Sequence, residues 1–275
     1  MVRDDRTTRV DAIAELMLSL LGTGRQITSL SASYPGFDLA QAYDVAARVR
    51  HMREARGEKA VGRKIGFTNT AVWDGYGISG PIWNHVYDTT VREVATNRAS
   101  FDLGTLPEAR IEPEIVLSLR TDLEPGMTDA EILASVDWVA HGFEIVYSIF
   151  PGWRFTAADA AAAHGVHAGL LIGERHRIDA DPERWQRMLS NFGVELENRD
   201  GVRSIGHARN VLGSPLKALR FLVEEIARFP GAAALRAGEI ITTGTLTDAM
   251  PARPGEAWTT RLSGIDLPGL ELQFG

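Results

Sequence analysis

The chain has 275 residues, of which 44% are hydrophobic and 24% are charged, as is typical of a globular protein with a sizeable core. It contains no cysteine, which excludes disulfides, thiolate metal sites and a catalytic cysteine. Its 29 basic and 36 acidic residues give a net charge of -7, and this disfavours a nucleic-acid partner, which would normally require a basic face.

The first 60 residues are predicted to be mainly helical. The stretch "AIAELMLSLLG" is interrupted by Glu15 and is followed by no small-residue cleavage site, so it indicates an amphipathic helix rather than a signal peptide. Asp38 can cap a second helix, with Gln41 three residues later, and Gly57 can end it. Since no run of about 18 apolar residues occurs, we expect no transmembrane helix, no membrane partner and a cytoplasmic protein.

From Val61 onward, short apolar runs broken by Gly, Pro, Asn and Asp predict strands and turns. We expect strands at 62–69, 110–119, 138–148, 238–247 and 257–265, and a loop at 74–84. A capping box at 128–131 predicts a helix that runs to about Trp138, "AADAAAAH" predicts a helical turn, and Ser214 followed by Pro215 predicts a helix to Phe229.

This order lacks a regular strand–helix–strand alternation, so a doubly wound sheet is not expected. We predict the α+β class and a single domain, with a helical N-terminal part at 1–60 packed on a β-rich core at 61–275.

The strand "RIEPEIVLSL" carries two glutamates inside an apolar run. Side chains alternate across a strand, so Glu112 and Glu114 share one face with Arg110. Neighbouring carboxylates repel each other unless a positive charge lies between them, and a divalent cation with oxygen-only ligands would be Mg²⁺ or Mn²⁺. The alternative is a solvated strand face on which Glu112 pairs with Arg110 or with a neighbouring strand. Pro113 further indicates an edge strand or a bulge.

Other single residues could join this site. Glu144, flanked by apolar residues in "HGFEIVYS", is either a buried salt-bridge partner or a third carboxylate ligand. Lys64 lies between two glycines in "GRKIGF", and is either an acid/base or anion-binding group or a surface lysine. The turn "TTGTLT" could offer donors to a carboxylate, and His164 and His167 could line a pocket, although each of these features also has a purely structural explanation. No P-loop, G-x-G-x-x-G, G-x-S-x-G or H-E-x-x-H motif occurs.

Six segments in order resemble the 2-keto-4-pentenoate hydratase / 4-oxalocrotonate decarboxylase family of the fumarylacetoacetate hydrolase superfamily. They are "VGRKIGFTN", "YGISGPIWNHVYD", "RIEPEIVLSL", "HGFEIVYS", "NVLGSPLKALRFLV" and "LRAGEIITTGTLTDAMPARPGE". The resemblance implies an α+β fold with a mixed, rolled β core and a Mg²⁺ or Mn²⁺ site. It implies that the metal ligands are Glu112, Glu114 and Glu144 and that Lys64 lies in the pocket. It also implies that the substrate-binding positions beside the metal are Arg110, Gly244 and Thr245.

The chain departs from the family in two places. Ile82 stands where many hydratases carry an acidic residue, which is closer to the decarboxylase branch, and His164 and His167 stand where polar neutral groups are usual. Trp83, Trp153 and Phe155 are candidates for shaping a larger pocket.

The resemblance implies a metal-dependent lyase that acts on a small 2-oxo acid of aromatic catabolism, most simply as a hydratase. A 4-oxalocrotonate-type decarboxylase is the first alternative. An acylpyruvate C–C hydrolase is the second, and it would require His164 or His167 to pair with Glu174. A non-catalytic binding or assembly partner is the third, and the retained glutamates and Lys64 argue against it. Such enzymes are expected to be homo-oligomers.

Overall fold

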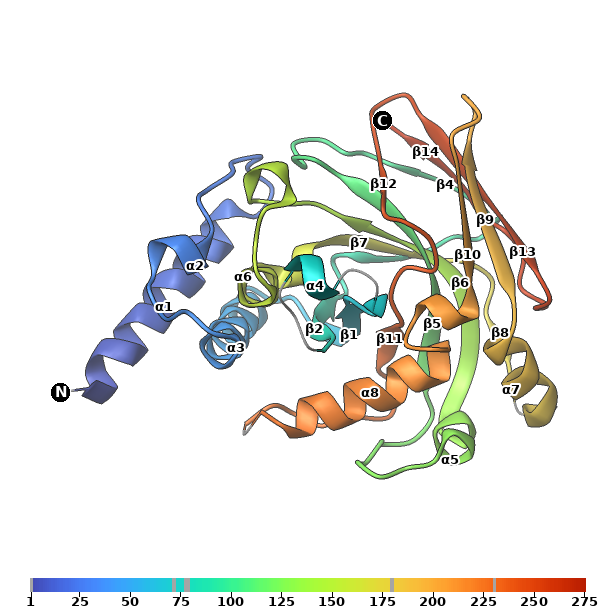
Figure 1. Cartoon of the computed structure of the whole chain (residues 1–275), viewed down its shortest axis with the longest axis horizontal. Coiled ribbons are helices and arrows are strands. Elements are labelled where there is room, and N and C mark those ends of the chain that lie inside the picture. The colour runs from blue at the N-terminus through green and yellow to red at the C-terminus, as the bar shows by residue number, and fades with distance from the viewer. Residues whose placement is uncertain (1, 71–72, 77–79, 179–180, 230) are drawn as a thin grey trace.

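The computed structural model describes residues 2–70, 73–76, 80–178, 181–229 and 231–275. Within these residues, helices α1 (Val2–Leu20), α2 (Leu30–Ser33), α3 (Leu39–Ala55) and α6 (Ala157–Ala162) gather at one end of the molecule (Figure 1). A five-stranded sheet stands at the other end, and a curled nine-stranded sheet lies between them. The predicted α+β class with a mixed, rolled β core is confirmed.

The described strands of the larger sheet run in the order β2-β1-β11-β5-β6-β7-β3, with β12 paired to β5 and β8 paired to β6. They are β1 (Ala60–Gly66), β2 (Ile82–Tyr87), β3 (Val91–Glu93), β5 (Arg110–Leu119), β6 (Val136–Val146), β7 (His167–Ile172), β8 (His176–Arg177), β11 (Ile240–Thr242) and β12 (Met250–Pro251). The smaller sheet has the order β10-β9-β13-β14-β4. Its strands are β4 (Arg98–Phe101), β9 (Gly193–Asn198), β10 (Arg203–His207), β13 (Ala257–Ser263) and β14 (Glu271–Phe274).

The remaining described helices are α4 (Trp73–Tyr76), α5 (Asp129–Ala134), α7 (Pro182–Ser190) and α8 (Pro215–Ala227), with short 3-10 turns at Pro151–Trp153, His164–Val166 and Ala208–Asn210. None of the helices in the described part of the chain has the length and apolar character that crossing a membrane requires.

Side-chain caps start the helices where the sequence predicts them. Asp38 accepts a hydrogen bond from the Gln41 backbone N–H at 2.8 Å, and Ser214 accepts one from the Lys217 backbone N–H at 3.2 Å. Gly57 follows α3 with a φ of +95°, a conformation that favours glycine and ends the helix. The predicted helical N-terminal region is therefore confirmed.

The two largest of three hydrophobic clusters among the described residues hold the elements together. The larger one joins the N-terminal helices and α8 to the curled sheet, for example through Met17, Val45 and Leu219. The other fills the space between the two sheets and includes Phe143 and Trp258. Burial of such side chains contributes about 1.5–3 kcal/mol each, so these clusters fix the strands that carry the polar residues between them.

Several predicted boundaries are wrong. The helix that opens at the capping box ends at Ala134 instead of near Trp138, because Val136 and Trp138 pair with β5 as the start of β6. The predicted loop at 74–84 contains helix α4 and the start of β2, where Ile82 pairs with Gly66; its residues 77–79 lie outside the described residues. The strand predicted at 238–247 shortens to β11, because the chain turns at Gly244.

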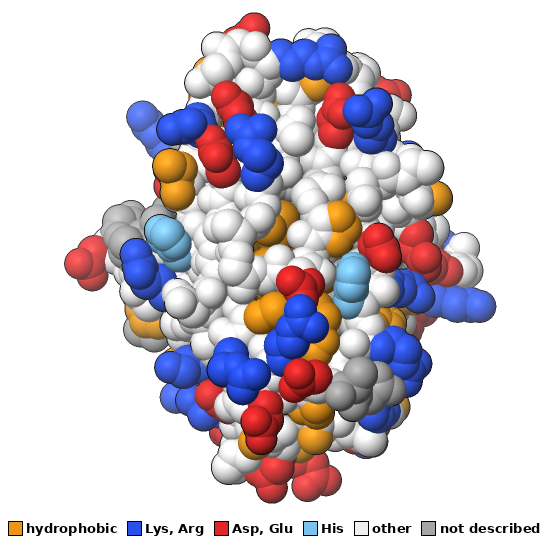
Figure 2. Space-filling model, turned by 90° about the vertical axis from the view of Figure 1, so that its right-hand side faces the viewer, with side chains coloured by type: hydrophobic (Ala, Val, Ile, Leu, Met, Phe, Trp, Pro, Cys, Tyr) orange, Lys and Arg blue, Asp and Glu red, His pale blue; other side chains and the backbone are white. Residues whose placement is uncertain are grey.

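The end of the molecule that carries the smaller sheet has a charged outer surface. Figure 2 shows side chains of both signs beside one another there, with only small and separate hydrophobic areas. Ion pairs join neighbouring strands of this sheet, as between Arg203 and Glu195 at 2.9 Å and between Arg261 and Glu197. This surface is suited to contact with water. The candidate site lies instead on the inner strands of the curled sheet.

Candidate metal centre

The three predicted carboxylates meet on strands β5 and β6. The antiparallel register places Glu112 directly opposite Glu144, and Glu114 opposite Gly142. One carboxylate oxygen from each of Glu112, Glu114 and Glu144 lies within 4.8 Å of the others. Glu114 and Glu144 are 0% exposed, and Glu112 is partly buried. Like charges opposite each other destabilise a sheet, so this arrangement calls for a positive charge.

Lys64 supplies one such charge from β1. Its Nζ lies 3.0 Å from Oε2 of Glu144, and both side chains are almost completely buried. Burial alone would lower the pKa of Lys64, but the charges of Glu144, Glu112 and Glu114 outweigh this effect and raise it. Lys64 is therefore an ammonium in the metal-free chain.

Hydrogen bonds orient the buried carboxylates. His167 donates from Nδ1 to Oε1 of Glu144 at 2.8 Å, since a carboxylate only accepts, and its Nε2 lies 2.9 Å from Oγ1 of Thr90. The Gly244 backbone N–H donates to Oε2 of Glu114 at 2.8 Å. Oε1 of Glu114 is buried and makes no hydrogen bond within the described part of the chain. A buried carboxylate oxygen without a donor fits a divalent cation as its partner.

The pKa values of the carboxylates separate strongly. Burial, together with the charge of Glu144, raises the pKa of Glu112 to about 7 in spite of Lys64. Burial and the charges of Glu144 and Glu112 raise the pKa of Glu114 well above its usual value. For Glu144, burial is outweighed by Lys64 and His167, which lower its pKa to about 2. The metal-free site therefore retains protons that a cation would displace.

Glu112 is the one of the three carboxylates that lines a cavity of about 240 Å³. Seven further predicted residues line it, namely Lys64, Ile82, Arg110, Trp153, Phe155, Gly244 and Thr245. Trp153 and Phe155 form an aromatic wall, and Cζ of Arg110 lies 4.2 Å from the ring centroid of Trp153. The cavity therefore combines cationic groups, backbone donors and a flat apolar surface.

Four expectations about the pocket are not met. His164 lies against helix α1, with its Nε2 3.3 Å from the Met17 carbonyl oxygen, and it does not line the cavity. His167 does not line the cavity either, because its ring is hydrogen-bonded to Glu144 behind it. Trp83 lies on the opposite face of β2 from the neighbouring Asn84, because side chains alternate along the strand. Glu174 is exposed and lies 3.9 Å from His176, so the proposed hydrolase pair with His164 or His167 does not form.

The interpretation of Pro113 as an edge or bulge residue is also wrong. β5 lies inside the sheet, and its register with β6 is unbroken from Arg110 to Ser118. The carbonyl of Pro113 accepts from the Leu246 N–H at 2.9 Å, in the segment between β11 and β12. The N–H position and the carbonyl of one residue point to the same side of an antiparallel strand, so the missing N–H of Pro113 faces the segment between β11 and β12. No hydrogen bond to β6 is therefore lost.

Asp248 and Thr90 are among the residues at the site that were missed. Asp248 lines the cavity and lies directly after the "TTGTLT" turn, so its position in that motif could have indicated it. Thr90 reaches the site only through His167 and comes from the turn after β2, where the sequence carries no such signal.

No protein-family model matches the chain. It is 33% identical over 204 residues to a 4-oxalocrotonate decarboxylase from a Pseudomonas species, which covers 74% of this chain and 75% of that protein. It is 27% identical over 257 residues to a 2-hydroxyhexa-2,4-dienoate hydratase from Comamonas testosteroni, covering 93% of this chain and 94% of the relative.

Solved structures show the same likeness. A 4-oxalocrotonate decarboxylase from Pseudomonas putida G7, complexed with magnesium and adipate, superposes with a TM-score of 0.88 at 26% identity and covers 98% of each chain. A fumarylpyruvate hydrolase from Pseudomonas aeruginosa, in complex with Mn²⁺ and pyruvate, shares the fold with a TM-score of 0.57 at 13% identity, covering 77% of this chain and 88% of the other.

Proposed function

The chain belongs to the 2-keto-4-pentenoate hydratase / 4-oxalocrotonate decarboxylase family, and on this premise we propose that it is a metal-dependent lyase acting on a small 2-oxo acid or its dienol. The observation that carries the proposal is the buried cluster of Glu112, Glu114 and Glu144 beside Lys64, at the base of a cavity. We take hydration of a 2-hydroxydienoate as the leading reaction.

Glu112, Glu114 and Glu144 would hold Mg²⁺ or Mn²⁺, because their oxygen-only donor set suits these ions. When bound, the cation would supply Lewis-acid stabilisation of negative charge on the substrate carboxylate and 2-oxygen. Gly244 and His167 orient the glutamates through their hydrogen bonds.

Lys64 is the proposed proton carrier. Its ammonium lines the cavity and is held by Glu144, so it can deliver a proton to a substrate atom in the cavity. The Gly244 and Thr245 segment contributes backbone donors beside this position, and Trp153 with Phe155 limits the access of water.

Arg110 favours a second candidate, the decarboxylation of a 2-oxo diacid. It lines the cavity two residues before Glu112 on the same strand face, which corresponds to a separation of roughly 7 Å. A diacid whose 2-oxo end faces the glutamates could place its far carboxylate against this guanidinium. A hydratase substrate with one carboxylate would not need this contact.

The test compares two substrates. Loss of the ultraviolet absorbance of 2-hydroxypenta-2,4-dienoate should depend on Mg²⁺ or Mn²⁺ and stop with chelator, and CO₂ release from 4-oxalocrotonate should be followed in parallel. Arg110→Leu should raise KM for the diacid by about tenfold or more, since a charge-assisted contact is lost, and change the dienoate KM little.

The matched control is Glu112→Gln combined with Glu114→Gln, which should lose both metal binding and turnover. Metal-independent turnover, or metal binding that persists in this double variant, would contradict the proposal. If the metal binds and neither substrate is consumed, the non-catalytic assembly partner becomes the better explanation.

The cellular setting belongs to the same proposal. We propose a cytoplasmic homo-oligomer of single-domain subunits without nucleic-acid or membrane partners, supported by the net charge of -7 and by the common symmetry of such enzymes.

A further inference from the structure

A second cavity lies behind the metal centre, on the reverse face of β1 and β2. Lys64 and its register partner Asn84 face the metal side, so the alternating Arg63, Trp83 and His85 face the other side. A cavity of about 470 Å³ lies between this reverse face, helix α3 and the segment after α8. Residues that line it include Tyr43, Arg50, Trp83, His85, Phe229 and Ala233.

Three buried nitrogen atoms at this face make no hydrogen bond to any described residue. They are Nε of Arg63, Nε1 of Trp83 and Nδ1 of His85, and these residues are only 3%, 4% and 5% exposed. Buried polar groups are normally paired, and an unpaired one is costly. Trp83 and His85 line the cavity, so their unpaired atoms indicate a missing common partner within it, while Arg63 lies beside them on β1.

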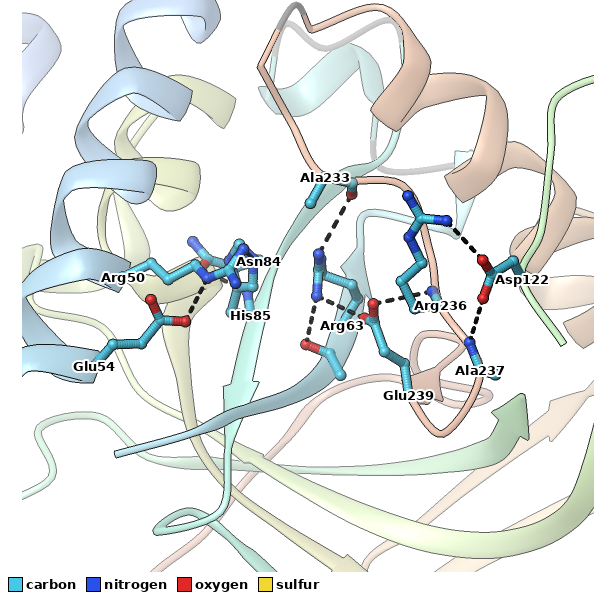
Figure 3. Close-up of polar contacts among 11 residues, drawn as sticks. Arg50, Glu54, Arg63, Asn84, His85, Asp122, Ala233, Arg236, Ala237 and Glu239 are labelled. Carbon is cyan, nitrogen blue, oxygen red and sulfur yellow. Dashed lines mark hydrogen bonds and ion pairs between the residues drawn. The ribbon is translucent and has the colours of Figure 1, made fainter. Parts of the chain in front are cut away.

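All three atoms are hydrogen-bond donors. Guanidinium and indole nitrogens can only donate, which settles Arg63 and Trp83. For His85, Nη1 of Arg50 lies 3.3 Å from Nε2 (Figure 3), and since arginine only donates, Nε2 accepts and Nδ1 carries the hydrogen. Burial and the charges of Arg63 and Arg50 also hold the pKa of His85 well below its usual value, so the ring is neutral. The missing partner must therefore be an acceptor.

The three donors lie close together. Arg63 and His85 are direct register partners on the antiparallel pair β1–β2. The ring centroids of Trp83 and His85 are 5.7 Å apart, and Cζ of Arg63 is 5.8 Å from the ring of Trp83. One small group with several acceptor lone pairs in the cavity can serve both Trp83 and His85, and a carboxylate offers about four such positions.

The charges around the cavity favour a ligand of low charge. Arg63 pairs with Glu239 at 2.6 Å, Arg50 with Glu54 at 2.8 Å, and Arg6 with Asp44 at 2.6 Å. Figure 3 shows Arg63 between Glu239 and Ala233, and Arg50 reaching from α3 to Glu54 and His85. Because each arginine already has a counter-ion, a dianion or phosphate would be poorly compensated, whereas a monocarboxylate would be tolerated.

Aromatic rings provide the other half of the site. The ring of Tyr43 stacks on Trp83 at 4.7 Å and lies 4.2 Å from Phe229, and all three residues line the cavity. These rings offer a flat apolar surface to a planar ligand body.

We propose that this reverse-face cavity is a second ligand site that binds a small aromatic monocarboxylate through the N–H groups of Trp83 and His85. The site is separate from the metal cavity, and β2 is the wall between them, because the adjacent residues Ile82 and Trp83 line the metal cavity and the reverse-face cavity respectively. The proposal does not depend on the reaction at the metal centre.

The test is a titration with 4-fluorobenzoate followed by ¹⁹F NMR, with chelator present so that no metal can bind the carboxylate. Binding to the full-length protein is expected in the millimolar range or tighter, and the neutral 4-fluorobenzamide should bind more weakly. Trp83→Phe removes one donor and keeps an aromatic ring, so it should weaken binding about threefold to tenfold.

Two further variants keep the result interpretable. Arg50→Met removes the donor that fixes the tautomer of His85 and should also weaken 4-fluorobenzoate binding, whereas Arg48→Met on the same helix, which pairs with Asp11 outside the cavity, should not. Arg50 is partly exposed, so this variant should fold even if Trp83→Phe does not.

Trp153→Phe in the metal cavity is the matched tryptophan control and should leave binding unchanged. Binding that falls with Trp153→Phe but not with Trp83→Phe would place the ligand in the metal cavity and overturn the proposal. It would equally be overturned by an absence of binding at millimolar concentrations, or by equal affinities in the wild type, Trp83→Phe and Arg50→Met, because water alone would then satisfy the three donors.

Discussion

At the scale of single residues, Lys64 and the glutamates stabilise one another's charges. Burial favours the neutral form of Lys64, but the charges of the three carboxylates favour the ammonium form more strongly. Burial likewise favours the protonated form of Glu144, but Lys64 and His167 favour its carboxylate form more strongly. Lys64 is therefore the internal countercharge of the metal-free site, and a bound cation and Lys64 would repel each other within it.

Replacing Lys64 should separate catalysis from metal binding. In Lys64→Met we expect turnover to fall about 100-fold to 10,000-fold, the usual contribution of a positioned acid or base. Metal affinity should stay the same or increase, because a positive charge next to the cation is removed. Steady-state kinetics and titration calorimetry with Mn²⁺ measure the two effects on one sample.

Lys59→Met serves as the control, because Lys59 is exposed just before β1. It should alter neither turnover nor metal affinity. Unchanged turnover in Lys64→Met would remove its proton-transfer role, and a large loss of metal affinity would show that Lys64 organises the glutamates.

At the scale of elements, the turn after β11 places a donor on Glu114. Gly244 adopts a φ of +95°, and a Cβ there would lie 1.9 Å from Oγ1 of Thr68. Thr243 fixes the start of the turn, because its N–H and Oγ1 both donate to the Ile115 carbonyl. The segment therefore needs glycine for both its conformation and its close packing.

Gly244→Ala should lower both stability and metal affinity. We expect a loss of at least about 1–3 kcal/mol in the free energy of unfolding, since strain and a clash add, and about tenfold weaker metal binding as the N–H leaves Glu114. Gly238→Ala is the matched control, because Gly238 has a φ of +88° with no atom near its added Cβ. Denaturant unfolding and metal titration of both variants check this, and equal losses in the two would refute a specific role for Gly244.

Elements also show what the sequence could and could not predict. Strand alternation was enough to place Glu112 and Glu114 on one face, and capping residues were enough to start α3, α5 and α8. The opposition of Glu112 and Glu144 depends on the long-range pairing of β5 with β6, which no local pattern encodes. The same limit explains why Trp83 was expected in the metal cavity, since only the register with β1 determines which face of the sheet it occupies.

At the scale of the whole molecule, the site makes the stability of the metal-free protein depend on pH. The pKa of Glu112 is about 7, above its usual value of 4.5, so between these pH values the folded chain binds more protons than the unfolded chain. The contribution of Glu112 to stability therefore falls as the pH rises through this range, and the raised pKa of Glu114 acts in the same direction. The buried His141 and His164, whose pKa values burial lowers to about 4, contribute in the opposite direction. The pKa of Glu144 is lowered to about 2, which has the opposite effect on stability. This effect develops mainly below pH 4.5 and is almost complete above pH 4.5.

A bound cation should reverse this trend, because it takes the place of the protons on Glu112 and Glu114. The difference in melting temperature between metal-loaded and chelated protein should therefore grow from about pH 5 to pH 8. At a metal concentration 100-fold above Kd, the gain in stability is about 2.7 kcal/mol, or about 5 °C in melting temperature for a chain of this size.

Calorimetric scans of the wild type beside the Glu112→Gln, Glu114→Gln double variant measure this gain. The double variant should show no metal effect, and its metal-free stability should lack the fall that Glu112 and Glu114 contribute over this range, because two of the titrating groups are gone. A metal-free wild type whose stability followed the same pH dependence as that of the double variant would mean that these carboxylates are already ionised without a cation, and that Lys64 alone balances them.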